Sequence, residues 1–123
     1  MTEPSGTNVG PLLAAAHAFD VEEVKRRLSA TGGYEVVHSS AWLEIGVYVL
    51  VAPEPDRQQP HDDDEVYFVL ERSGILDIEG TEVPLREGHA LFVPAGAKHG
   101  FSAYERLSLL VLFERTPPRG TSG

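Results

Sequence analysis

The stretch QQPHDDDEVYFVLERSG, residues 58–74, joins one histidine and four consecutive acids to an apolar run. Side chains of an extended strand alternate between two faces. One face of this strand then carries Glu65, Tyr67 and Val69, and the other carries Val66, Phe68 and Leu70. Both faces are apolar after Glu65, so the strand is predicted to lie inside a two-layer structure. Gln59 and His61 share the parity of Glu65, and burying such groups without partners is costly, so a metal ion is one way to satisfy them.

A second stretch, GHALFVPAGAKHGFSA at residues 88–103, predicts a further polar side chain at the same end of the barrel. An apolar strand at 89–94 runs into the tight turn Pro94–Gly96, and His99 begins the next strand. A turn of this kind returns the chain to the same mouth of a barrel. We therefore expect His99 to face His61 and Glu65.

The remaining pattern indicates an all-β fold with one short N-terminal helix. Asp20 can cap a helix over about 20–31, with Glu23 three residues later and Gly32 at its end. Beyond it the hydrophobic period changes to two. Strands are expected at 34–39, 42–52, 65–71, 74–79, 81–86, 89–94 and 106–115, with turns at 79–80 and 86–88. Closely spaced short strands are typical of a sandwich or barrel.

Composition narrows the classes of function. A chain of 123 residues fits one domain; we expect it at 11–115, between flexible tails at 1–10 and 116–123. The net charge of −9 argues against a nucleic-acid partner and an anionic membrane surface. The sequence has no cysteine, no signal-peptide pattern and no apolar run long enough to span a bilayer. A cytoplasmic location is therefore expected.

The two stretches resemble the two motifs of the cupin superfamily. In the second motif, the positions in register are Gly88, Pro94, Gly96 and His99, with Ala103 where asparagine is usual. In the first motif His61 and Glu65 are in register, whereas Gln59 stands at the first histidine and Pro53 and Arg72 stand at the two glycines. The resemblance covers residues 53–103 and implies a double-stranded β-helix, or jelly-roll, barrel of the RmlC-like kind.

The resemblance also implies a metal site. Its ligands would be His61, Glu65 and His99, with Gln59 as a possible fourth, around one divalent ion of Fe, Mn, Co, Ni or Zn. Two imidazoles and one carboxylate leave positions open for a substrate. The alternative for these residues is a metal-free barrel with an inherited polar pocket.

Other candidate residues have more ordinary interpretations. Tyr67 and Phe101 are expected to line the pocket, and Tyr67 is a candidate proton donor beside Glu65. Asp62, Asp63 and Asp64 are interpreted as a solvated turn at the barrel mouth, with Asp63 alone on the interior parity.

The leading hypothesis is a metal-dependent enzyme acting on a small organic molecule, with isomerase, lyase, cyclase or dioxygenase chemistry. The alternatives are a non-catalytic small-molecule-binding module and a metal-free enzyme that uses Tyr67 or His99 as acid or base. We expect a homodimer, formed through the apolar segment 11–19 and the outward face of residues 66, 68 and 70, with a monomer as the alternative.

Overall fold

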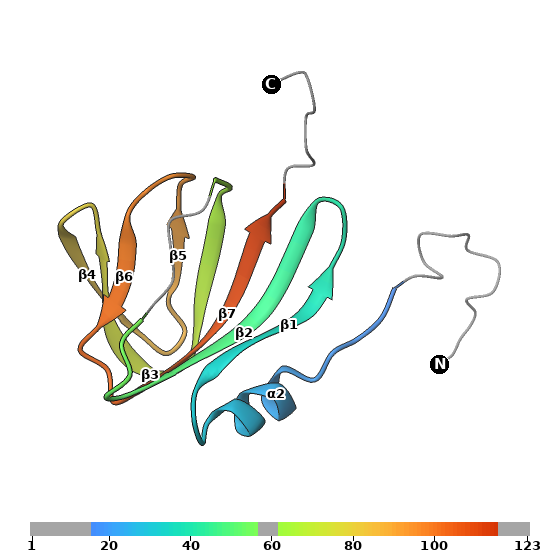
Figure 1. Ribbon diagram of the computed structural model, residues 1–123, viewed down its shortest axis with the longest axis horizontal. Helices are drawn as coiled ribbons and strands as arrows, with labels where there is room; N and C mark the ends of the chain where they lie inside the picture. The colour runs from blue at the N-terminus through green and yellow to red at the C-terminus, as the bar shows by residue number, and fades with distance from the viewer. Residues whose placement is uncertain (1–15, 57–61, 116–123) are drawn as a thin grey trace.

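The computed structural model describes residues 16–56 and 62–115, and it consists of one helix and seven strands in this part of the chain (Figure 1). In chain order these are α2 (Val21–Leu28), β1 (Gly33–Ser39), β2 (Leu43–Val51), β3 (Glu65–Ile78), β4 (Thr81–Arg86), β5 (Ala90–Val93), β6 (His99–Ser102) and β7 (Arg106–Glu114). The predicted all-β class with one short helix is confirmed. Gln59 and His61 lie outside the described residues.

All strand pairs are antiparallel, in the order β1-β2-β7-β3-β4, with β5 and β6 also paired to β3. The first part of β3 lies between β5 and β7, and its second part lies between β4 and β6. The long strand β3 therefore belongs to both layers of the barrel. Figure 1 shows β4 and β6 on one side of the molecule and β1 and β2 on the other.

The sequence interpretation of β3 as two strands, 65–71 and 74–79, is wrong. One strand runs from Glu65 to Ile78, and its register against β7 shifts between Val69 and Glu71. Arg72 follows with a φ of +72°. A bulge with one left-handed residue bends a strand without ending it. Arg72 and Ser73, which the sequence interpretation placed between two strands, therefore form a bend within one strand.

The helix begins where the sequence predicts and ends earlier. The Asp20 side chain accepts a hydrogen bond from the Glu23 backbone N–H at 3.0 Å. At the other end, the Gly32 N–H donates to the Leu28 carbonyl at 2.7 Å, and Gly32 has a φ of +82°. This C-terminal cap by Gly32 ends α2 at Leu28 rather than near residue 31. Val24 is buried against Val47 and Val49 of β2, so α2 covers part of the outer face of the sheet.

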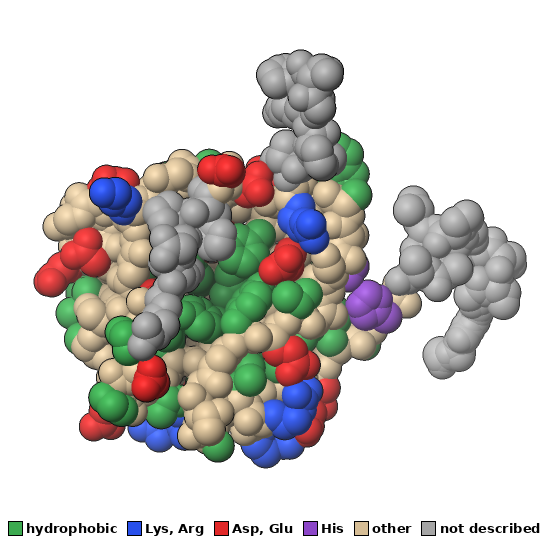
Figure 2. Space-filling model, in the orientation of Figure 1, with side chains coloured by type: hydrophobic (Ala, Val, Ile, Leu, Met, Phe, Trp, Pro, Cys, Tyr) green, Lys and Arg blue, Asp and Glu red, His purple; other side chains and the backbone are tan. Residues whose placement is uncertain are grey.

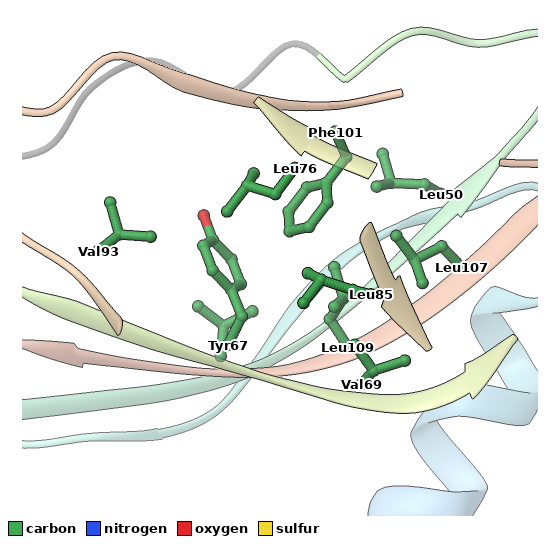
Figure 3. Close-up of a cluster of buried hydrophobic side chains, with 10 residues drawn as sticks. Leu50, Tyr67, Val69, Leu76, Leu85, Val93, Phe101, Leu107 and Leu109 are labelled. Atoms are coloured by element: carbon green, nitrogen blue, oxygen red, sulfur yellow. The ribbon is translucent and has the colours of Figure 1, made fainter. Parts of the chain in front are cut away.

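The two faces of β3 match the predicted alternation. Glu65, Tyr67 and Val69 are buried, whereas Val66 and Phe68 are 36% and 38% exposed. Figure 3 shows the inner side of this strand, where Tyr67 and Val69 point into a cluster between the layers. The other members of the cluster are Leu50, Leu76, Leu85, Val93, Phe101, Leu107, Leu109 and Val111.

The other predicted strands have bounds within one residue of those observed. The predicted turn at 79–80 is confirmed, because Glu79 and Gly80 have φ values of +49° and +88°, as a tight hairpin requires. Within the described residues, the helix is too short and too polar to cross a bilayer.

Candidate functional site

The structure brings Glu65 and His99 together inside the barrel. Glu65 is the first residue of β3 and His99 is the first residue of β6. The Nε2 atom of His99 lies 2.9 Å from Oε1 of Glu65, and each side chain is 1% exposed. The predicted meeting of these two residues, which are far apart in the sequence, is therefore present in the fold.

The His99 ring is held by a hydrogen bond on its other side. Its Nδ1 atom lies 2.8 Å from the carbonyl oxygen of Ala97, which can only accept, so Nδ1 carries a proton. The hydrogen bond to Glu65 raises the pKa of His99; burial lowers this pKa, and the Ala97 carbonyl and the charges of Glu65 and Asp56 raise it further. When the ring is neutral, the lone pair of Nε2 points at Glu65.

That arrangement needs a positive charge or a shared proton. A neutral Nε2 and a carboxylate oxygen are both hydrogen-bond acceptors. Two acceptors lie 2.9 Å apart only when a proton or a cation is shared between them. The second oxygen of Glu65, Oε2, is buried and has no hydrogen-bond partner among the described residues. A buried carboxylate oxygen without a partner is costly. A metal ion held by Glu65 and His99 would supply the positive charge that this pair needs.

The residues present therefore fit a metal ion, although the described part of the chain does not hold a complete site. Within residues 16–56 and 62–115 there is no group of three or more His, Cys, Asp or Glu side chains that could bind one. The described residues supply Glu65 and His99. The other two predicted ligands, His61 and Gln59, lie on the segment outside the description.

Tyr67 lies beside this pair, as the alternation along β3 predicts. Its hydroxyl is 3.0 Å from Nε2 of His99. The ring is fully buried and packs edge-on against Phe101 at 4.9 Å, and Figure 3 shows the hydroxyl pointing away from β3 into the space between the layers. Phe101 is only 5% exposed and supports the Tyr67 ring, and it also lines a hollow of about 300 Å³ with residues 52–56.

The acidic turn before β3 is only partly as predicted. Asp62 is exposed, in agreement with a solvated turn. Asp64, however, accepts a hydrogen bond from the Ala95 N–H at 2.9 Å, and its carbonyl accepts one from the Glu114 N–H at 3.0 Å. Asp64 thus fixes the turn at 94–96 to the start of β3.

Asp56 is a functional candidate that sequence reasoning missed. Its Oδ1 accepts the Tyr48 hydroxyl at 2.6 Å, and its Oδ2 accepts the Phe101 N–H at 2.8 Å. One carboxylate therefore joins the end of the 52–56 loop to β2 and to the strand that carries His99. The available sequence signal was that Asp56 is the one acid between Pro55 and Pro60, shortly before His61.

Tyr34 and Glu44 are a second missed pair, on the inner face of β1 and β2. The Tyr34 hydroxyl donates to Oε2 of Glu44 at 2.8 Å. Burial, this hydrogen bond, and the charges of Glu44 and Glu65 raise the pKa of Tyr34 far above its usual range, so the phenol stays protonated.

Comparison with known proteins gives the class. The model of the cupin domain matches residues 47–113, which is more than half of the chain. An uncharacterized protein of Streptomyces coelicolor, SCO3923, is 33% identical over 103 residues, covering 82% of this chain and 96% of that protein. The chain therefore belongs to the cupin family.

Solved structures agree with this assignment. The TT1209 protein of Thermus thermophilus is 27% identical, with a TM-score of 0.65 over 81% of this chain and 98% of that one. An RmlC-like cupin from Methanocaldococcus jannaschii, described as a double-stranded β-helix, is 18% identical, with a TM-score of 0.64 over 71% of this chain and 83% of that one. The predicted double-stranded β-helix is confirmed.

Proposed function

We propose that the protein is a metal-dependent enzyme acting on a small organic molecule. Glu65 and His99 would bind one divalent transition-metal ion together with His61, with Gln59 as a fourth donor. The observation that carries the proposal is the buried Glu65–His99 pair, in which Oε2 of Glu65 has no partner among the described residues. Imidazole and carboxylate donors suit Fe, Mn, Co, Ni and Zn alike, so the identity of the ion stays open.

The hydrogen bond from His99 to Ala97 supports ligation by Nε2. A proton fixed on Nδ1 leaves Nε2 as the donor atom, which is how ligating histidines are usually oriented. When bound, the ion would supply Lewis-acid chemistry, which polarises a substrate carbonyl. Tyr67, 3.0 Å from Nε2, is the group placed to hold or deliver a proton beside the reacting atoms.

A metal-free acid–base enzyme is the second candidate, and the raised pKa of His99 favours it. In that case an imidazolium–carboxylate pair would satisfy Oε1, and Tyr67 or His99 would move the proton. Oε2 would still lack a partner within the described part of the chain, which is why the metal hypothesis is preferred.

Titration of metal-free protein with Co²⁺, followed by visible absorption, separates the two candidates. The metal hypothesis predicts ligand-field bands that saturate at one ion per chain and disappear in Glu65→Gln and His99→Ala. His89→Ala is the matched control, because His89 lies in the β4–β5 turn and its Nδ1 accepts the Arg86 N–H. Absence of saturable bands in the unchanged protein would favour the metal-free alternative.

A further inference from the structure

The chain that precedes α2 runs beside β1, on the outer side of the sheet (Figure 1). The ring centroids of His17 and His38 lie 5.2 Å apart, and Phe19 is partly buried. His38 lies opposite Ile45, which shares the parity of Val47, a residue packed under α2. Figure 2 shows histidine side chains at the edge of the molecule where β1 lies. The segment before α2 is therefore in contact with the outer face where the described chain begins.

A hollow of about 390 Å³ opens on the same outer face, at the end of the sheet where β2 and β3 begin. Its apolar lining comes from Trp42, Leu43, Val66 and Leu112. Leu112 lies opposite Val66, so their side chains project together to the outer side. Trp42 is 68% exposed and Val66 is 36% exposed, which leaves a large apolar surface in this hollow to be covered.

The chain before His17 is long enough to reach this hollow. His38 and Leu43 lie on neighbouring strands, two residues out of register, so their Cα atoms are about 8 Å apart. Leu13 stands four residues before His17, and four extended residues span up to about 13 Å. Leu12 and Leu13 are therefore within reach of the hollow along the outer face.

The residues at this distance have the chemistry that the hollow can accept. Residues 11–16, PLLAAA, include two leucines and carry no charged side chain. Asp64, Glu65 and Glu114 also line the hollow, so an anionic occupant is disfavoured. Aliphatic side chains that pack against Trp42 lose contact with water, and this burial is favourable.

We propose that residues 11–15 dock in this hollow of their own chain, with Leu12 and Leu13 packed against Trp42 and Leu112. The occupant is the same chain because a short tether, already in contact with the outer face at its far end, gives a high effective concentration of these residues. The docked segment would extend the outer layer that α2 begins.

The docked segment would have a consequence for the strand that carries the proposed metal ligand. The hollow adjoins the start of β3, so the segment would pack beside Glu65 from the outer side. Among the described residues, Phe68 and Phe92 lie outside the lining of the hollow and are 38% and 54% exposed. They therefore stay accessible to a second copy of the chain. The inference does not depend on the metal.

Trp42 is the single tryptophan of the chain, so tryptophan fluorescence of the full-length protein reports on this hollow. Leu12→Asp/Leu13→Asp should raise the constant for acrylamide quenching and shift the emission to longer wavelength, because a carboxylate is costly to bury there. Ser5→Asp/Thr7→Asp is the matched control: it adds the same charge outside the docked residues and should behave as the unchanged protein does. Equal quenching and emission in all three proteins would overturn the proposal.

The sequence has no cysteine, which allows a second test of whose chain fills the hollow. Ala14→Cys/Glu114→Cys places one thiol on the docked segment and one beside the hollow, and it leaves both leucines unchanged. Oxidation with copper phenanthroline should join the two thiols within one chain, seen as loss of both thiol hydrogens in the intact mass and no dimer on a non-reducing gel. Ala14→Cys/Glu82→Cys is the control, because Glu82 is an exposed residue of β4, away from the hollow, and both thiols should stay reduced.

Two results of the oxidation would overturn the proposal. A disulfide-linked dimer of Ala14→Cys/Glu114→Cys would assign the hollow to the segment of a second copy. Thiols that stay reduced in this variant, as in the control, would show that the segment does not dock there.

Discussion

Glu65 and His99 lie 2.9 Å apart, Oε1 to Nε2, at the starts of two strands that both belong to the barrel interior. In metal-free protein, each side chain offsets the free-energy cost of burying the other. Removing one partner of a buried pair typically costs about 3–5 kcal/mol, whereas replacing both with apolar residues of similar size is often neutral or stabilising.

The first prediction follows from this pairing. In chelator, His99→Ala should lower the free energy of unfolding by about 3 kcal/mol, because it leaves the Glu65 carboxylate buried without compensation. The double variant Glu65→Leu/His99→Leu should be close to the unchanged protein in stability. Urea unfolding measures both. A double variant less stable than either single variant would refute the explanation.

The second prediction concerns pH. The folded-state pKa of His99 is raised above its ordinary 6.5, with the Glu65 hydrogen bond as the largest cause. Protonated His99 therefore stabilises metal-free protein fully below about pH 6.5, and this contribution is lost as pH rises through the folded-state value. Unfolding free energies measured in chelator across this range should show the decline. It should be absent in His99→Gln, and an equal decline in that variant would contradict the assignment.

The third prediction concerns the loop anchor. Asp56→Ala removes acceptors for the Tyr48 hydroxyl and the buried Phe101 N–H, so it should lower the unfolding free energy by about 1–3 kcal/mol. Co²⁺ affinity should fall as well, because Asp56 fixes the start of the segment that leads to His61. Asp62→Asn, at an exposed acid beyond that segment, is the control. Unchanged Co²⁺ affinity in Asp56→Ala would show that the anchor is only structural.

The homodimer stays a prediction from the sequence. The outward side chains of Val66, Phe68 and Phe92 are 36–54% exposed, and both Phe92 and Leu112 lie opposite Val66 in the register. We expect light scattering coupled to size exclusion to give twice the mass of one chain. Phe68→Glu/Phe92→Glu should halve that mass. A monomeric unchanged protein would refute the prediction.

The sequence predicted those features that depend on the local pattern of side chains alone. The period of two along residues 65–69 predicted which side chains are buried, and Asp20 predicted the start of the helix. The corner at Arg72 was missed because a non-glycine residue with positive φ has no clear sequence signal. Glu65 and His99 were paired in advance by the tight turn at 94–96, which returns the chain to the same mouth of the barrel, and by the motif resemblance.

The rest of the site depends on the register of strands distant in the sequence. Glu44 lies near Glu65 only because both face Phe113, and nothing in the local sequence of β2 fixes that alignment. Tyr34 lies against Gly46 because β1 and β2 pair with a particular offset. Such relationships become visible only once the sheet is assembled.

The most direct test of the metal site is elemental analysis of protein purified without chelator. Near-stoichiometric transition metal is expected in the unchanged protein and in His89→Ala, and it should be lost in His99→Ala and Glu65→Gln. Absence of metal from the unchanged protein, or equal metal content in His99→Ala, would contradict the account.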